Sequence, residues 1–95
     1  MRQYYVYIMS NRAHVLYIGM TGDLGGRARQ HLEGAKAGFT QRYHLGRLVY
    51  FEAYDQIAEA IACEKQLKHW NRQKKIALIE SLNPKWSDLS RGWED

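Results

Sequence analysis

The chain has 95 residues, with 14 Lys and Arg against 10 Asp and Glu and a formal net charge of +4. This length suits one domain, which we expect to span residues 1–95 and to bury about 60 to 65% of the surface exposed by the unfolded chain. The single cysteine, Cys63, excludes an intramolecular disulfide and a thiolate zinc cage, and it fits a reducing cytosol. No apolar run approaches the ~18 residues of a membrane span, so we expect a cytoplasmic protein whose charge favours anionic partners such as nucleic acid.

Two runs rich in β-branched and aromatic residues, 4–9 and 15–20, are separated by turn residues and predict an antiparallel hairpin. Because side chains alternate between the two faces of a strand, Tyr5 and Tyr7 share one face of the first strand. Tyr17 shares one face of the second strand with a glycine. Three tyrosines can therefore converge, although ordinary aromatic packing across a strand pair would also explain them.

A short helix is predicted at about residues 24–33, after a turn that supplies an N-cap. Gly25 and Gly26 each weaken its first turn by up to about 1 kcal/mol relative to Ala. Arg27 and His31 lie four residues apart and therefore on one face of this helix. A cation beside an imidazole suits a phosphate group, but a solvated helix face would show the same spacing.

The rest of the chain predicts a loop at 34–46, a strand at 47–54, a long helix at 55–70 with Asp55 as its N-cap, and a last helix at about 73–82. The order ββαβαα predicts an α/β (α+β) sandwich, in which a three-stranded, mainly antiparallel sheet is flanked by helices. Trp86 and Trp93 follow the last helix, and we expect both to cover the core.

Glu64 is a misfit in the long helix. At about 100° per residue the apolar positions of this helix form one stripe, and Glu64 falls inside it. The apolar positions are Ile57, Ala60, Ile61 and Leu67. An ionised carboxylate is costly to bury unless a cation or a set of donors compensates it. Glu64 is therefore a partner in a structural ion pair, a carboxylate that reaches past the stripe to water, or a ligand of a metal ion.

A basic run without acids follows Glu64 and crosses the junction of the last two helices. Its bases are Lys65, Lys68, Arg72, Lys74 and Lys75, with His69 and Trp70 among them. Such a run usually marks a solvated helix face. Because this one lies beside Glu64 and includes a ring that can pack on a sugar or base, we predict a surface for the phosphate backbone of nucleic acid. Arg42, in the preceding loop, is assigned to the same surface.

Taken together, these residues resemble the GIY-YIG nuclease domain, and in particular its small stand-alone bacterial members. The resemblance extends over essentially the whole chain. It rests on Tyr5-Val6-Tyr7, Tyr17-Ile18-Gly19, Thr21, Leu24, Arg27, His31 and Glu64, in this order and on these elements. The chain departs from the family pattern at Tyr5-Val6, where the family name has Gly-Ile, and at Gly25-Gly26, where polar or basic residues are expected.

The resemblance implies a reaction and roles for the residues that match. Glu64 would bind one divalent metal ion, Mg²⁺ or Mn²⁺, which would polarise the scissile phosphate. Tyr17 would act as a base or orient the attacking water, with Tyr7 beside it. An unperturbed tyrosine has a pKa near 10, so a base role calls for nearby cations. Arg27 would stabilise charge on the phosphate in the transition state.

Two further positions receive roles from the same resemblance. His31 would assist proton transfer or hold the phosphate, and Asn83 would support the site. The expected protein is a Mg²⁺-dependent endonuclease that hydrolyses DNA phosphodiester bonds, in DNA repair or recombination. The alternatives are a catalytically weak nucleic-acid-binding module and a nuclease subunit whose protein partner selects the substrate. Pure binding needs bases and rings but no misfit acid, so the full set favours the enzyme.

Overall fold

The computed structural model describes residues 2–33 and 44–93, and for residues 31–33 the backbone alone. Its elements, in chain order, are β1 (Tyr4–Ser10), β2 (Leu16–Thr21), α1 (Leu24–Glu33), β3 (Arg47–Tyr54), α3 (Ile57–His69) and α4 (Arg72–Leu82). The predicted order ββαβαα is confirmed. No helix in the described part of the chain is both long and apolar enough to cross a membrane.

The three strands form one sheet in the order β2-β1-β3, and both strand pairs are antiparallel. The prediction of a three-stranded antiparallel sheet is therefore confirmed. β1 lies in the centre, and β2 is an outer strand. The register places Tyr7 of β1 opposite Gly19 of β2, and a bulge interrupts the pairing of β1 with β3 between Ile8 and Met9. These pairings decide which side chains meet at the β2 edge.

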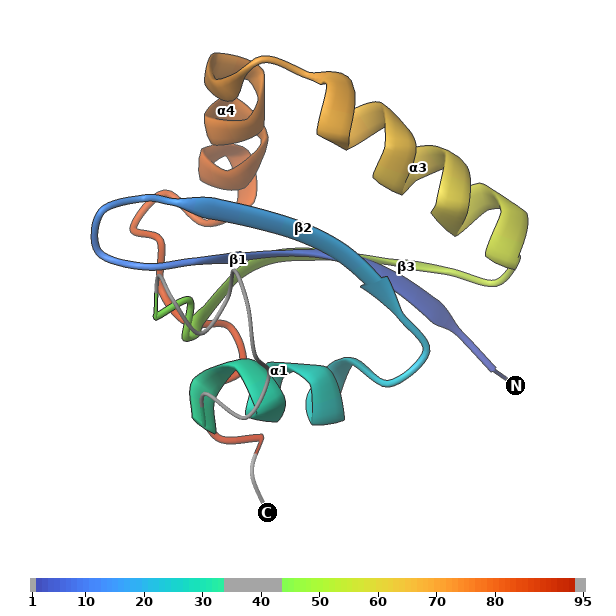
Figure 1. Ribbon diagram of the computed structural model, residues 1–95, viewed down its shortest axis with the longest axis horizontal. Coiled ribbons are helices and arrows are strands. Elements are labelled where there is room, and N and C mark those ends of the chain that lie inside the picture. Colours follow the sequence, from blue (N-terminus) through green and yellow to red (C-terminus); the bar gives the residue numbers. More distant parts are fainter. Residues whose placement is uncertain (1, 34–43, 94–95) are drawn as a thin grey trace.

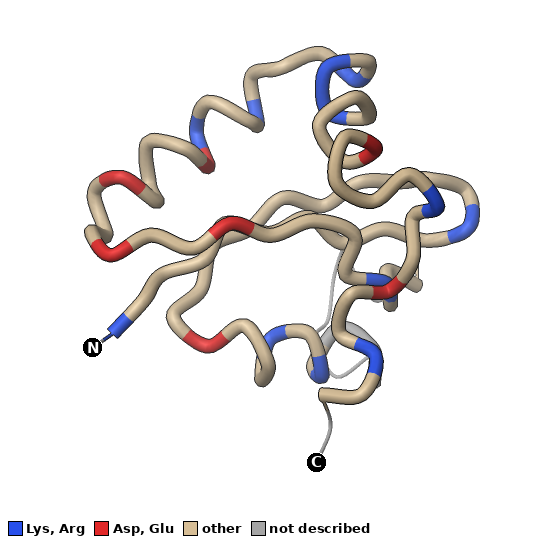
Figure 2. The backbone as a smooth tube through the Cα atoms, turned by 180° about the vertical axis from the view of Figure 1, so that it is seen from behind, with Lys and Arg blue, Asp and Glu red and all other residues tan. Residues whose placement is uncertain are grey.

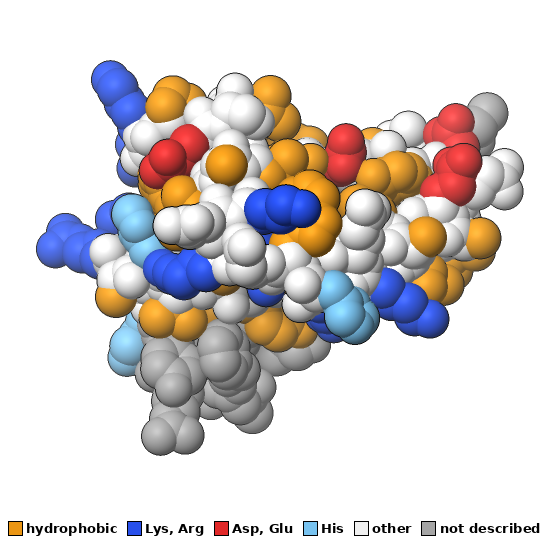
Figure 3. Space-filling model, turned by 90° about the horizontal axis from the view of Figure 1, so that it is seen from above, with side chains coloured by type: hydrophobic (Ala, Val, Ile, Leu, Met, Phe, Trp, Pro, Cys, Tyr) orange, Lys and Arg blue, Asp and Glu red, His pale blue; other side chains and the backbone are white. Residues whose placement is uncertain are grey.

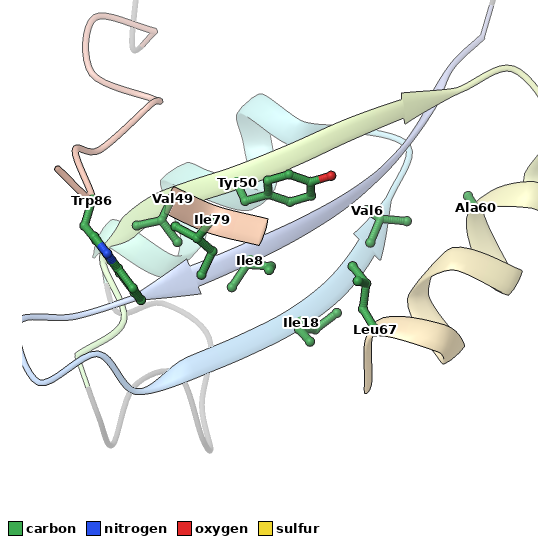
Figure 4. Packing of buried hydrophobic residues seen from close by; sticks show 9 residues of the cluster. All are labelled: Val6, Ile8, Ile18, Val49, Tyr50, Ala60, Leu67, Ile79 and Trp86. Carbon is green, nitrogen blue, oxygen red and sulfur yellow. The ribbon is translucent and has the colours of Figure 1, made fainter. Parts of the chain in front are cut away.

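Helices cover both faces of this sheet (Figure 1): α3 and α4 lie over one face, and α1 lies under the other with the end of the chain. A hydrophobic core fills the space on the α3 and α4 side (Figure 4). Its buried residues are Val6, Ile8, Ile18, Val49, Tyr50, Ala60, Leu67, Ile79 and Trp86. A smaller core on the α1 side consists of Tyr7, Met9, Leu24, Leu45 and Leu48. The alternation of side chains along β1 thus supplies both cores.

Helix α3 packs through a narrower stripe than the sequence predicts. Ala60 is fully buried and Leu67 is 3% exposed, but Ile57 and Ile61 are 48% and 36% exposed. The prediction that these two isoleucines belong to the buried stripe is wrong, because α3 meets the sheet along the line from Ala60 to Leu67. On a helical projection Glu64 lies about 40° from Ala60, toward the isoleucines. Glu64 therefore lies at the edge of the buried stripe.

The helix caps differ in detail from those expected. The N-cap of α3 is Gln56, which makes no capping hydrogen bond through its side chain, so the prediction of Asp55 is wrong. Asp55 instead accepts a hydrogen bond from Gln3 Nε2 at 3.4 Å. Helix α4 begins at Arg72, and the Asn71 side chain caps it by accepting from the backbone N–H of Lys74 at 2.8 Å.

The two tryptophans after α4 have different environments. Trp86 is 5% exposed, and its indole N–H donates to Glu80 Oε2 at 2.7 Å, so it covers the core as predicted. Trp93 is 41% exposed and meets the ring of Phe51 edge to face, with 5.8 Å between centroids. The prediction that Trp93 covers the core is wrong. It contacts a half-buried ring at the rim of the smaller core and leaves much of its own surface open.

Candidate active site

The Tyr7 side chain crosses the outer strand β2 at Gly19. Tyr7 is 1% exposed, and a Cβ atom built on Gly19 would lie 2.6 Å from the Tyr7 hydroxyl oxygen and 2.7 Å from Cζ. Real Cβ atoms do not approach other atoms this closely, so only glycine leaves room for the phenol. Gly19 therefore allows the Tyr7 hydroxyl to reach the β2 edge of the sheet.

Tyr17 lies beside Tyr7 on the same face of the sheet. The two ring centroids are 6.3 Å apart and the rings are tilted by 44°. Tyr17 is half-buried, whereas Tyr7 is buried. The two phenols predicted to converge are therefore adjacent. Tyr5, the third tyrosine, packs edge to face against Phe51, with 6.3 Å between the ring centroids.

The first turn of α1 positions Arg27. Asp23 caps the helix, because its Oδ1 accepts from the backbone N–H of Gly26 at 3.1 Å and its carbonyl accepts from that of Arg27 at 3.0 Å. The Asp23 N–H in turn donates to Thr21 Oγ1 at 3.0 Å. A Cβ atom on Gly26 would collide with the Asp23 carboxylate. Gly26, the second residue of the Gly25-Gly26 pair that departs from the family pattern, is thus needed for the cap that holds Arg27 in place.

Side chains from three other elements affect the pKa of the Tyr7 hydroxyl on β1. The pKa of Tyr7 is raised to about 12, chiefly by burial and then by the neighbouring Tyr17, while the charge of Arg27 and a hydrogen bond from its side chain act in the opposite direction. The carboxylate of Glu64 adds a smaller effect that raises this pKa. The Tyr7 hydroxyl therefore lies within electrostatic reach of Tyr17, Arg27 and Glu64. We place the candidate site at the β2 edge, where α1 and α3 approach from opposite faces.

Glu64 is half-buried and forms an ion pair. Its side chain is 22% exposed, and Oε2 lies 3.1 Å from Nζ of Lys68, whose side chain is 54% exposed. The spacing of four residues is the sequence signal for such a pair. Because Lys68 is largely in water, the pair compensates the carboxylate only weakly. Both the ion-pair interpretation and the metal-ligand interpretation of Glu64 are therefore compatible with this geometry.

The bases of the run 65–75 lie along α3 and the first turn of α4 (Figure 2). Arg72 Nη2 donates to the carbonyl of His14 at 2.6 Å and so ties α4 to the turn between β1 and β2. Lys74 Nζ lies 5.5 Å from the centroid of the Trp70 ring. Lys65, like Lys68, is exposed, and Lys75 is half-buried. Figure 3 shows basic side chains along this face of the molecule, and their contact with nucleic acid stays a prediction.

For three of the predicted functional residues, no described contact joins the side chain to Tyr7, Tyr17, Arg27 or Glu64. His31 lies in α1, but its side chain is outside the described part, and Arg42 lies outside the described residues altogether. Asn83 is buried, and its side-chain amide is used by the backbone: Nδ2 donates to Val49 O at 3.1 Å and to Ser87 O at 2.8 Å, and Oδ1 accepts from Ser87 N at 3.0 Å. Its role as support for the site stays a prediction.

The sequence of this chain is similar to a family model and to proteins from other organisms. Residues 3–77 match the family model for the GIY-YIG catalytic domain. A UPF0213 protein of Haloquadratum walsbyi is 36% identical over 77 residues, which cover 81% of this chain and 86% of the relative. A UPF0213 protein of Staphylococcus aureus is 35% identical over 80 residues, covering 84% and 98%.

The fold is also similar to a solved structure. The solution NMR structure of a UPF0213 protein from Bacillus halodurans matches with a TM-score of 0.57 and 30% identity, over 90% of this chain and 92% of that one. The match of the family model spans the two hairpin strands, α1, β3, α3 and the start of α4. The chain therefore belongs to the GIY-YIG catalytic domain family, a family of nucleases.

Proposed function

We propose that this protein is a metal-dependent endonuclease that hydrolyses DNA phosphodiester bonds by in-line attack of water. The observation that carries the proposal is that Tyr17, Arg27 and Glu64, from β2, α1 and α3, all lie within electrostatic reach of the Tyr7 hydroxyl on β1. A structural cluster of aromatic residues needs neither a guanidinium nor a carboxylate. Phosphoryl transfer needs both positive charge on the phosphate and a group that handles a proton.

The donor set suits a weakly held magnesium ion. Glu64 is the carboxylate of the cluster, and no group of three or more His, Cys, Asp or Glu that could hold a metal occurs among residues 2–30 and 44–93, whose side chains the structure describes. Mg²⁺ is usually bound by one or two carboxylates together with water and substrate phosphate, whereas zinc is held by three or four protein ligands. When bound, the ion would polarise the phosphate and stabilise the charge on the leaving oxygen.

The side chains of the protein supply orientation and charge. Arg27 carries a fixed positive charge beside the phenols and can bind two phosphate oxygens at once. Tyr7, with its pKa raised to about 12, keeps its proton at neutral pH and donates hydrogen bonds. Tyr17 is the more accessible phenol, so we assign to it the contact with the attacking water. His31 and Asn83 keep the supporting roles implied by the family.

A cleavage assay on a panel of labelled DNA structures, with and without Mg²⁺ or Mn²⁺, tests this proposal. The panel contains single strands, blunt duplexes, forks and flaps. We expect metal-dependent cleavage of at least one structure and a loss of about 10² to 10⁴-fold in single-turnover rate for Tyr17→Phe, which keeps the ring but removes the hydroxyl.

Tyr4→Phe is the matched control, because it removes the hydroxyl of another half-buried tyrosine that packs against the core on the opposite face of the sheet. Its cleavage rate should equal that of the wild type. Binding of DNA without cleavage of any structure, with either metal, would favour the alternative of a binding module. Full activity of Tyr17→Phe would contradict the assigned role of the phenol.

A further inference from the structure

A hollow opens on the α1 side of the molecule, away from the face of α1 that carries Arg27. It lies between α1 and residues 84–93, the C-terminal segment, and is lined by Gly25, Ala28, Arg29, Ser90, Arg91 and Trp93. Figures 1 and 2 both show this segment running beside α1. The residues matched by the GIY-YIG family model end at 77, so the C-terminal segment lies outside the family match.

The C-terminal segment is held in place by the backbone of β3. The N–H of Leu89 donates to Leu48 O at 2.7 Å, and the N–H of Leu48 donates to Asp88 Oδ1 at 3.1 Å. The same Asp88 oxygen accepts from Ser90 N at 3.0 Å and from Ser90 Oγ at 2.7 Å. The Asp88 carboxylate, which also lines the hollow, is therefore occupied in bracing the segment. One wall of the hollow is thus fixed relative to the sheet.

The lining carries two cations and an open aromatic face. Arg29 and Arg91 are exposed, and no carboxylate of the described residues lies within ion-pair distance of either guanidinium. Trp93 is 41% exposed, and its edge contact with Phe51 restricts the ring without covering it. An adjoining hollow shares Trp93 and Gly25 and is lined also by Tyr5 and Phe51. The partly exposed rings of Trp93, Tyr5 and Phe51 therefore line a surface that adjoins the two arginines.

Gly25 leaves the floor of the hollow empty. A Cβ atom built on Gly25 would meet no other atom within 4 Å, in contrast to Gly26, where the cap needs glycine. No internal contact of the described residues explains a glycine at position 25, and a glycine weakens the helix. The absence of a side chain keeps both adjoining hollows open to an outside molecule.

We propose that this hollow binds an unpaired nucleotide of the DNA substrate, with the base stacked on Trp93 and the adjacent phosphates held by Arg29 and Arg91. Guanidinium groups next to an exposed ring are the chemistry that recognises a single strand, because the faces of paired bases are hidden in a duplex. The inference rests on the proposed function for its ligand. It names the substrate class: DNA with an unpaired strand near the cut.

The distance to the candidate active site suits this assignment. Gly25, Ala28 and Arg29 lie on one side of α1, and Arg27 lies on another, because successive helix residues are turned by about 100°. The two sites are therefore separated by roughly one helix diameter, about 10 Å. A stacked strand covers that distance with about three nucleotides. One strand can thus occupy the hollow while its phosphodiester bond lies at Arg27.

Fluorescence anisotropy with labelled dT10 and with a blunt DNA duplex of two separate strands, both in EDTA to prevent cleavage, tests the inference. Trp93→Ala should weaken dT10 binding by about 5- to 150-fold, the loss expected for one stacked base. Gly25→Leu should weaken it as well, because its side chain would extend into the hollow from a position where a Cβ atom meets no other atom within 4 Å. Binding of the duplex should not change in either variant.

Leu82→Ala, which shortens a 71% exposed apolar side chain outside both hollows, is the control and should bind dT10 like the wild type. Wild-type dT10 affinity in both hollow variants, or equal losses for dT10 and the duplex, would overturn the inference. Tighter binding of rU10 than of dT10 would overturn the assignment to DNA. Cleavage of the DNA panel by the wild type is a separate readout, so the proposed nuclease function and the nucleotide site can fail independently.

Discussion

At the scale of single residues, Gly19 has the clearest physical role in the candidate site. Its missing side chain allows the Tyr7 phenol to cross β2, since a Cβ atom would lie 2.6 Å from the hydroxyl oxygen. We expect Gly19→Ala to displace the Tyr7 ring, to lower the free energy of unfolding by about 1 to 3 kcal/mol and to abolish cleavage. Denaturant unfolding and single-turnover cleavage measure the two effects.

Gly22→Ala is the matched control for this prediction. A Cβ atom on Gly22 would approach only the far end of the Arg2 side chain, with Nη2 at 3.1 Å, and that flexible side chain can move away. Its stability and cleavage rate should stay close to those of the wild type. If Gly19→Ala cleaves DNA at the normal rate, the position of the Tyr7 hydroxyl does not matter for the reaction.

At the scale of the element, the two adjacent glycines of α1 should respond in opposite directions to the same substitution. Gly25→Ala adds helix propensity in open space and should raise the free energy of unfolding by about 0.5 to 1 kcal/mol. Gly26→Ala forces the Asp23 carboxylate away from its capping position and should lower it by about 0.5 to 2 kcal/mol. Thermal melts of the two variants provide the comparison, and equal shifts would contradict the role of Gly26 in the cap.

An element can be predicted from the sequence when residues close together in the chain determine it. Strand alternation and helix periodicity are local, so β1, β2 and the order of the elements could be predicted. The burial of Ile57 and Ile61 could not, because it depends on the line along which α3 crosses the sheet. The N-cap of α3 shifted by one residue to Gln56, and cap positions shift by a residue or two easily.

The candidate site was predictable for a different reason than the nucleotide hollow. Tyr7, Arg27 and Glu64 match a pattern of residue types and order in the chain, and such a pattern can be identified in the sequence without knowledge of the fold. Arg29 and Arg91 are far apart in the chain and become neighbours only because the C-terminal segment is bound to β3. Nothing in their sequence context marks them as one site.

At the scale of the whole molecule, buried tyrosines should make the fold sensitive to alkaline pH. Burial, followed by the nearby Glu52 carboxylate, raises the pKa of Tyr50 well above its usual value, and that of Tyr7 is raised to about 12. The unfolded chain releases these protons near pH 10, before the folded protein does, so the free energy of unfolding should fall as the pH rises above about 10. Guanidinium midpoints at about pH 9 and pH 11 should show this fall, and the fall should be smaller in Tyr50→Phe. An equal pH dependence in both proteins would mean that Tyr50 is not a source of the alkaline sensitivity.

The basic face along α3 and α4 should contribute to DNA binding without regard to sequence. Lys65 and Lys74 are exposed and make no ion pair with other described residues, so Lys65→Gln and Lys74→Gln should each lower the slope of log K against log salt by about 1. Lys85→Gln, outside this run, is the control. Salt titrations of DNA binding that give the wild-type slope for both variants would exclude this face from the interface.

The central claim is that Glu64 serves the reaction rather than the fold, and Glu64→Gln tests it most directly. Because its ion-pair partner Lys68 is 54% exposed, loss of the pair should change the free energy of unfolding by no more than about 1 kcal/mol. Glu59→Gln, an exposed acid on the same helix, is the control and should remain active. The measurement is the metal-dependent cleavage rate of both variants beside their thermal melts. We predict that Glu64→Gln folds like the wild type, still binds DNA and loses cleavage by at least about 100-fold; an active Glu64→Gln protein, or one that is inactive because it has unfolded, would contradict the claim.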